Sequence, residues 1–317
     1  MNATEGPMRV GGLTLHVRDV GSGPPLLLIN GLGAHTAMWA PVERRLPGMR
    51  LISFDAPGIG DSPRVWPPPS IPMLADRITL LLDQLGLDRV DVLGYSFGGA
   101  VAQELAGRHP DRVHRLVLVA TTLGRGALVG DFKSVAHICN PIRYYSRRYY
   151  ERSIGDLAGG QARWDEDFRR RHGAERRAKR PHPLPYYHQI GALTAWSSLP
   201  WLDRVATPTL VVSGDDDPLV PLANSMLIAS RLRKARLFVA PGEGHLLLFD
   251  DNGVVHDPIR EFLLAPTLAE STTWQEATRV DEEMAEAAIA ERGMRPLPWG
   301  PINAVLRHRL SPPGSPS

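Results

Sequence analysis

The chain has 317 residues, with 36 Lys or Arg and 34 Asp or Glu, which leaves a formal net charge of +2. This near-neutral balance argues against a nucleic-acid-binding protein, and 43% hydrophobic with 22% charged residues is typical of a globular fold. Cys139 is the single cysteine, and neither a disulfide framework, a metal motif nor an apolar run long enough to cross a bilayer is present, so we expect a soluble, cytoplasmic protein without a metal or other cofactor.

Short apolar runs typical of strands alternate with helix-length stretches in the first third of the chain, and this alternation resumes after residue 206. Strands that alternate with helices predict a mostly parallel sheet, and strands covered on both faces are almost continuously apolar. The expected strands are 26–29, 50–54, 90–93, 116–119, 208–212 and 235–239, and the clearest helices are 71–85 and 99–109. The pattern therefore predicts an α/β fold with a central sheet flanked by helices.

The segment 121–205 interrupts this alternation. It lacks strand-like runs, is broken by Pro and Gly, and holds most of the tyrosines, so we predict a helical cap inserted into the core. Residues 141–180 within it carry 12 Lys or Arg against 6 Asp or Glu. We interpret this excess as the solvated surface of helices, and an electrostatic docking face for an anionic surface is the alternative.

The composition changes again after residue 264. An acidic, Ala-rich stretch over 271–291 predicts one amphipathic helix that begins at a Ser-Thr-Thr cluster, and a Pro-rich tail follows over 296–317. The expected organisation is thus a core of residues 1–120 and 206–264, a cap of residues 121–205, and a C-terminal extension of residues 265–317.

A Gly-x-Ser-x-Gly motif, Gly94 to Gly98, lies between an expected strand and an expected helix. A nucleophile on such a sharp turn has a strained backbone, and its neighbours two residues away must be small so that strand and helix can approach. Ser96 is therefore the candidate nucleophile at the carboxyl edge of the sheet. A glycine-rich turn with an incidental serine is the alternative.

A serine hydroxyl needs a base that takes its proton, and that base needs a carboxylate that orients it. His245 lies in a glycine-rich loop after the expected strand 235–239, which places it at the same sheet edge. Asp215, Asp216 and Asp217 follow the strand 208–212. We choose Asp217, because it occupies the acid's place in a Gly-x-x-Asp-x-x-Val-Pro pattern, and assign the other two to turn capping.

An oxyanion formed during acyl transfer needs two backbone N–H groups directed at it. The residue after the nucleophile, Phe97, supplies the first. We assign the second to Leu32, in the Asn30-Gly31-Leu32-Gly33 loop that follows the first buried strand. A plain β-turn is the alternative for this loop.

Together these motifs resemble the α/β-hydrolase family over about residues 13–264, including the segment 55–62. Within that family the sequence is similar to intracellular medium-chain-length poly(3-hydroxyalkanoate) depolymerases. This similarity rests on Asn30, where most relatives have His, on residues 214–221, and on the cap segments 186–189 and 196–202. Phe97 stands where the depolymerases usually have Trp, and the extension after residue 264 has no counterpart in them.

The resemblance implies ester hydrolysis through an acyl-enzyme, without a cofactor, on a hydrophobic ester or polyester and with a storage granule as a partner surface. The candidate substrate contacts are Asn30, Gly31, Tyr95, Tyr186, Trp196 and Trp201. Aromatic residues of a cap are also commonly its core. A carboxylesterase or lipase, a C–C bond hydrolase, and a non-catalytic receptor or granule-coating protein are the alternatives.

Overall fold

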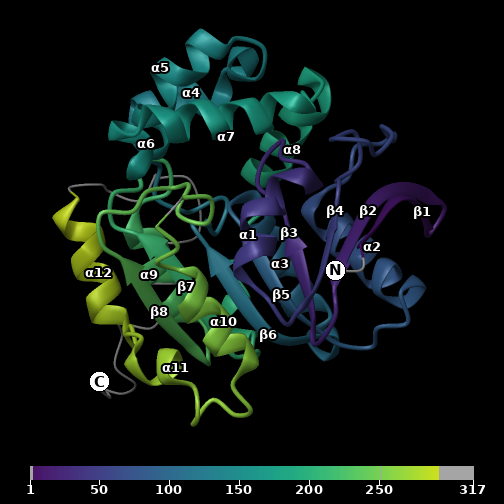
Figure 1. Cartoon of the computed structure of the whole chain (residues 1–317). Helices are drawn as coiled ribbons and strands as arrows, with labels where there is room; N and C mark the ends of the chain where they lie inside the picture. The colour runs from purple at the N-terminus through teal and green to yellow at the C-terminus, as the bar shows by residue number, and fades with distance from the viewer. Residues whose placement is uncertain (1–2, 251, 293–317) are drawn as a thin grey trace, which may run out of the picture.

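The computed structural model describes residues 3–250 and 252–292. An eight-stranded sheet with strand order β1-β2-β4-β3-β5-β6-β7-β8 runs through the molecule (Figure 1). Strands β3 to β8 are parallel, whereas β1 and β2 join one edge as an antiparallel hairpin. The strands are β1 Ala3–Val10, β2 Leu13–Gly21, β3 Pro25–Ile29, β4 Arg50–Phe54, β5 Val90–Tyr95, β6 Val113–Val119, β7 Thr209–Gly214 and β8 Ala235–Ala240.

The central strands are apolar throughout because each face of the sheet packs against its own layer of helices. In β3, Leu27 and Ile29 contribute to one apolar cluster, whereas Leu26 and Leu28 contribute to the other. Successive side chains of a strand point to opposite faces, so a continuous Leu-Leu-Leu-Ile run fills both layers. All the strands predicted from the apolar runs are therefore present.

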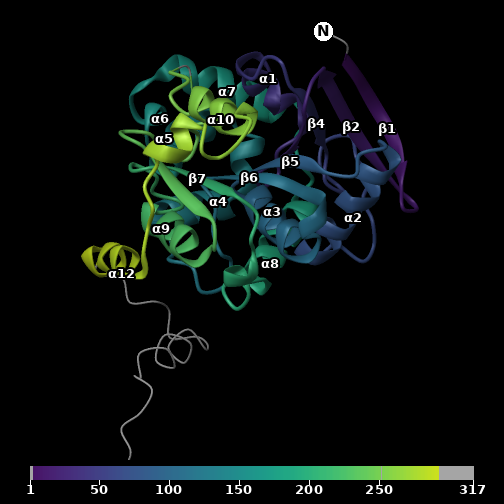
Figure 2. The same cartoon turned by 90° about the horizontal axis from the view of Figure 1, so that it is seen from below.

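Helices α2, α3 and α9 cover one face of the sheet, and α1 and α10 cover the other (Figure 2). No helix in the described ranges combines the length and apolar composition that crossing a bilayer requires. The helices of the two layers are α1 Ala40–Arg45, α2 Ile71–Gln84, α3 Phe97–Arg108, α9 Leu222–Arg231 and α10 His256–Leu264.

A helical region is inserted between β6 and β7 and lies over the carboxyl ends of the parallel strands (Figure 1). Side chains at the helix starts accept hydrogen bonds from free N–H groups, as Ser146 does for α5 and Asp165 for α7. The inserted helices are α4 Phe132–Cys139, α5 Arg147–Ala158, α6 Gln161–Trp164, α7 Glu166–Ala178 and α8 Pro183–Ala195.

Two features of the termini differ from the sequence-based expectation. The β1–β2 hairpin was not predicted. The single helix expected over 271–291 is two helices, α11 Thr272–Glu276 and α12 Glu282–Glu291, because Thr278 pairs with Leu237 of β8 between them. Helix α12 packs on α9, where Arg231 pairs with Glu282 at 3.2 Å, and not on the inserted helices. The Pro-rich tail predicted over 296–317 lies outside the described residues.

Candidate active site

Ser96 lies at the turn between β5 and α3 with φ 53° and ψ −118°, a conformation that a non-glycine residue adopts only under constraint. The turn is held by the Ser96 N–H, which donates to the Val119 carbonyl at 2.9 Å. A Cβ at Gly98 would overlap the carbonyl oxygens of Ile29 and Asn30. The glycines of the motif therefore permit the close approach that lifts Ser96 above the sheet edge.

His245 lies within hydrogen-bonding distance of this serine, with its Nε2 3.0 Å from Ser96 Oγ. Its N–H donates to the Ala158 carbonyl of α5 at 2.6 Å, and its carbonyl accepts from Tyr95 Oη at 3.0 Å. The Tyr95 ring also contacts the imidazole, with a centroid separation of 5.4 Å. Backbone bonds and ring packing thus fix the imidazole on an otherwise irregular loop.

Asp217 lies on the far side of the imidazole, with its Oδ2 2.8 Å from His245 Nδ1. Its Oδ1 accepts from the N–H groups of Leu219 at 2.9 Å and Val220 at 2.8 Å, and the residue is 2% exposed. Its two neighbours serve the loops instead. Asp215 accepts from the Gly242 N–H at 2.6 Å, and Asp216 pairs with Arg163 of α6 at 2.7 Å.

The two residues assigned to the oxyanion line the same apolar cavity as Ser96. Phe97 is the first residue of α3, where an N–H has no acceptor within the helix. Leu32 lies in the loop after β3, and its carbonyl accepts from Arg176 Nη2 at 2.7 Å and from Tyr144 Oη at 3.1 Å. The next amide, Gly33 N–H, donates to Gln189 Oε1 at 2.9 Å. Side chains from the inserted region therefore hold this loop in place.

Ser96 lines two cavities of different character. The larger, of about 390 Å³, is mainly apolar and opens from Leu32 and Phe97 toward the inserted helices, and the exposed Cys139 lies on its wall. Its apolar lining comprises Leu128, Val129, Val135, Ile138, Ile190, Leu193, Leu219 and Val220. The smaller, of about 20 Å³, brings His245 together with Arg143, His172 and Arg176, and apolar side chains such as Ile154 and Leu157 complete its wall.

This arrangement can perform nucleophilic acyl transfer. An imidazole within 3.0 Å of the Ser96 hydroxyl can accept its proton, and a buried carboxylate on the opposite nitrogen stabilises the resulting imidazolium. A free N–H group at the start of α3, directly after Ser96, can stabilise the negative oxygen that forms when a carbonyl is attacked. These steps use only side chains and backbone groups of the chain.

Comparison with known proteins agrees with this geometry. A family model described as the alpha/beta hydrolase fold matches residues 24–252. The chain is an α/β hydrolase. A poly(3-hydroxyalkanoate) depolymerase from Ectopseudomonas oleovorans is 37% identical over 75% of this hydrolase and 84% of its own length. A 2-hydroxy-6-oxo-2,4-heptadienoate hydrolase from Pseudomonas putida is 30% identical over 84% of this chain and 98% of its own length. A crystal structure of a hydrolase from Pseudomonas aeruginosa has a TM-score of 0.70 at 25% identity, covering 82% of this chain and 98% of that one.

Three predicted substrate contacts lie elsewhere in this hydrolase. Trp196 donates from its indole Nε1 to Glu104 Oε2 of α3 at 2.7 Å, and its ring meets Trp201 at 6.1 Å between centroids. Trp201 in turn packs against Gly107 at the end of α3. Tyr186 is fully buried, and its hydroxyl bonds to Ile138 and Arg143. These aromatic residues join the inserted region to the core and do not line either cavity at Ser96.

The other three predicted contacts are closer to the nucleophile. Gly31 and Tyr95 line the smaller cavity beside Ser96, and the Tyr95 hydroxyl is already bonded to His245. Asn30 is 9% exposed and lines a separate small cavity behind the loop, with neither atom of its carboxamide bonded to another described group. Of the six predicted contacts, Gly31 and Tyr95 alone line a cavity that Ser96 also lines.

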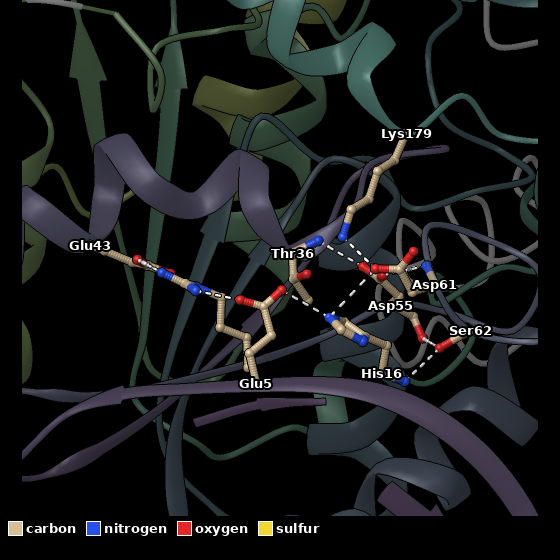
Figure 3. A network of polar contacts seen from close by, with 9 residues as sticks. Glu5, His16, Thr36, Glu43, Asp55, Asp61, Ser62 and Lys179 are labelled. Carbon is tan, nitrogen blue, oxygen red and sulfur yellow. Dashed lines mark hydrogen bonds and ion pairs between the residues drawn. The ribbon is translucent and has the colours of Figure 1, made fainter. Parts of the chain in front are cut away.

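A polar network holds Thr36, at the point where the loop that carries Leu32 ends (Figure 3). Asp55 accepts from the N–H groups of Thr36 at 2.7 Å and Asp61 at 2.9 Å, and burial raises the pKa of its carboxyl despite these bonds. Asp61 also pairs with Lys179, which ties the inserted region to the core. His16, Asp55 and Asp61 are close enough to hold a cation, but each already bonds to groups of the chain.

Sequence reasoning missed the most unusual residues of the site. Arg143 and Arg176 were counted in the basic excess of residues 141–180 and interpreted as solvated surface, whereas they are 2% and 8% exposed beside Ser96. Much of the remaining excess is paired, as Arg147 is with Glu151 and Arg163 with Asp216. Charge patterning does not report burial, since the exposed Arg147 lies in the same Tyr- and Arg-rich sequence as Arg143.

Proposed function

We propose that this hydrolase cleaves hydrophobic acyl esters, with medium-chain poly(3-hydroxyalkanoate) or its oligomers as the substrate class. The observation that carries the proposal is the continuous chain Ser96–His245–Asp217 at the end of an apolar cavity of about 390 Å³. A cavity of this size and lining suits an acyl chain of medium length. The depolymerase from Ectopseudomonas oleovorans, 37% identical, supports the same substrate class.

In the proposed reaction, His245 takes the proton of Ser96 while Oγ attacks the ester carbonyl. The Phe97 and Leu32 amides stabilise the oxyanion, each contributing on the order of 3 kcal/mol to transition-state binding. The ester C–O bond then breaks, and His245 delivers the proton to the departing alcohol oxygen. Water, deprotonated by the same imidazole, hydrolyses the acyl-enzyme and restores the serine.

We propose that residues 121–205 act as a cap that encloses the acyl cavity and meets the substrate surface. Large apolar side chains on this segment are exposed, including Phe132 at 87% and Trp164 at 68%. Apolar groups in such number on one inserted region suit contact with a hydrophobic solid rather than with water. We therefore propose that the enzyme acts at the surface of a storage granule in the cytoplasm.

The first test compares hydrolysis of p-nitrophenyl octanoate, p-nitrophenyl acetate and suspended medium-chain polyester by the purified protein. We expect the octanoate to be preferred over the acetate, and the polyester to release soluble hydroxy acids. Ser96→Ala should abolish turnover and labelling by a fluorophosphonate, whereas Ser230→Ala, on α9, should change neither. Undiminished turnover by Ser96→Ala would refute the nucleophile, and inert native protein would favour a non-catalytic receptor.

A C–C bond hydrolase is the second candidate, because the heptadienoate hydrolase from Pseudomonas putida aligns over 98% of its length. The same serine, histidine and aspartate would serve that reaction. A vinylogous 1,5-diketone substrate, followed by loss of its visible absorbance, separates the two functions. We expect ester turnover to exceed diketone turnover by at least about tenfold, and the reverse order would transfer the assignment to C–C cleavage.

A further inference from the structure

Two guanidinium groups are buried beside the nucleophile without an anionic partner. Arg143, in the helical turn Pro141–Tyr144 after α4, is 2% exposed, and Arg176 of α7 is 8% exposed. Both line the smaller cavity together with Ser96 and His245. Among residues 3–250 and 252–292, neither guanidinium has a carboxylate within ion-pairing distance. Buried arginines are ordinarily paired with an acidic group, so this pair calls for an explanation.

The protein provides these guanidiniums with neutral partners only. Arg143 Nη2 donates to the hydroxyls of Tyr186 at 2.7 Å and Tyr144 at 3.1 Å. Arg176 Nη2 donates to the Leu32 carbonyl at 2.7 Å and to the Tyr144 hydroxyl at 2.6 Å. Both guanidiniums also lie over the Tyr144 ring, at 4.8 and 5.0 Å from its centroid. Neutral acceptors and ring faces stabilise a cation, but they leave its charge uncompensated.

Unused hydrogen-bonding atoms accompany this charge. The Nε of Arg143 and of Arg176, and the Nε2 of His172, are buried without a partner among the described groups. Burial, together with the positive charges of Arg176 and Arg143, lowers the pKa of His172 to about 3. The His172 imidazole is therefore neutral at pH 7, because burial and the nearby positive charges both disfavour its protonated form. Electrostatics and unsatisfied donors therefore indicate the same kind of ligand, an anion.

We infer that the smaller cavity binds a carboxylate of the substrate, located on the alcohol side of the scissile ester. The inference rests on the proposed ester hydrolysis. His245 and Leu246 line this cavity, whereas Phe97 lines the apolar one, so a group held here belongs to the part of the ester that His245 protonates as it leaves. A volume of about 20 Å³ accommodates one small group and excludes a second acyl chain.

The substrate class that meets these conditions is a 3-(acyloxy)alkanoic acid, which is the free-acid end of a hydroxyalkanoate oligomer. Its carboxylate is separated from the ester oxygen by two carbon atoms, which suits a charge site adjacent to the nucleophile. Attack by Ser96 forms the new Oγ–C bond, the ester C–O bond breaks, and the proton from Ser96 passes through His245 to the 3-hydroxyl of the departing acid. Oligomers are then shortened by one hydroxy acid at a time from this end.

The test compares kcat/KM for 3-(octanoyloxy)octanoic acid with kcat/KM for its neutral primary amide. We expect the native enzyme to prefer the acid by at least about tenfold, the discrimination that charge-assisted hydrogen bonds confer. Arg143→Gln and Arg176→Gln should each lower this ratio toward one. Arg147→Gln, an exposed cap position paired with Glu151, is the matched control and should retain the native ratio.

A second measurement does not depend on turnover or on the arginine variants. Ser96→Ala protein should bind 3-hydroxyoctanoate at least about tenfold more tightly than 3-hydroxyoctanamide in calorimetric titrations. Equal affinity for both, or an equal loss for acid and amide in the arginine variants, would overturn the carboxylate site and leave the arginines as supports of the Leu32 loop. Hydrolysis of neutral p-nitrophenyl esters reports separately on the proposed function.

Discussion

At the scale of single residues, the site depends on a constrained backbone conformation at Ser96 and on the small size of the glycines around it. Ser96 adopts φ 53°, and the surrounding glycines allow the carbonyls of β3 to approach the start of α3. A side chain at Gly98 meets only backbone atoms, which cannot move aside as a flexible side chain can. The loss of stability when a glycine is replaced should therefore depend on what surrounds that glycine.

Gly98→Ala tests this dependence. Its Cβ would overlap the Ile29 carbonyl oxygen, so we expect a loss of about 1–3 kcal/mol in the free energy of unfolding and a lower kcat. Gly191→Ala is the control, because this glycine lies in α8 with open space around it, and a gain of about 0.5–1 kcal/mol is expected. Urea titrations of both variants measure these changes, and similar effects in the two would contradict the argument.

Asp250 is a second residue with a measurable consequence. Burial, followed by the neighbouring Glu243 carboxyl, raises the pKa of Asp250 to about 8. The folded state therefore binds one more proton than the unfolded state between about pH 4 and pH 8, and stability falls as pH rises through this range. Asp250→Asn should flatten this dependence and stabilise the protein at pH 9 by about 1–3 kcal/mol. Parallel stability profiles for the native protein and the variant from pH 5 to 9 would show the prediction to be wrong.

At the scale of elements, the sheet was predictable because buried strands are continuous apolar runs, as in β3 and β6, and both faces need that composition. The β1–β2 hairpin was not, since its outer positions are exposed and its sequence lacks an apolar run. The serine, histidine and aspartate could be placed on strand-end loops from their flanking glycines and prolines. The buried arginines and the aromatic contacts could not, because their burial depends on how α7 and α8 pack.

The seam between the end of α8 and α3 yields a prediction at this scale. Trp196→Phe removes the indole N–H that bonds Glu104 and leaves a carboxylate that is 6% exposed without this donor. We expect a loss of about 1–3 kcal/mol in stability, with KM for p-nitrophenyl octanoate unchanged. Trp201→Phe, which keeps a ring against Gly107, should cost less. A selective rise in KM for Trp196→Phe would restore this residue as a substrate contact.

At the scale of the whole molecule, positive charge and apolar surface are both concentrated on the inserted region, but they differ in their exposure to solvent. Its cations are largely paired or buried, as Lys179 is with Asp61 and Arg176 is beside Ser96. Its apolar side chains Phe132 and Trp164 remain exposed. Adsorption to a substrate surface should therefore be governed by apolar contact and depend little on ionic strength.

Replacing both exposed aromatics, Phe132→Ser with Trp164→Ser, tests this expectation. The double variant should sediment with polyester particles severalfold less than the native protein, at low and high salt alike, while hydrolysing p-nitrophenyl octanoate normally. Trp66→Ser removes an equally exposed aromatic from the core and serves as the control. Adsorption that disappears in high salt would instead favour electrostatic docking of the basic helices.

The position of Cys139 makes the acyl cavity directly observable. It is the single thiol of the chain, and it is accessible on the wall of that cavity. A maleimide fluorophore would consequently attach at one known point without prior removal of competing cysteines, and its emission would report occupancy by acyl chains of graded length in real time. A bulky adduct there should slow the hydrolysis of long-chain esters more than that of short-chain esters. The acyl length at which hydrolysis begins to slow would then measure how far along the cavity Cys139 lies from Ser96.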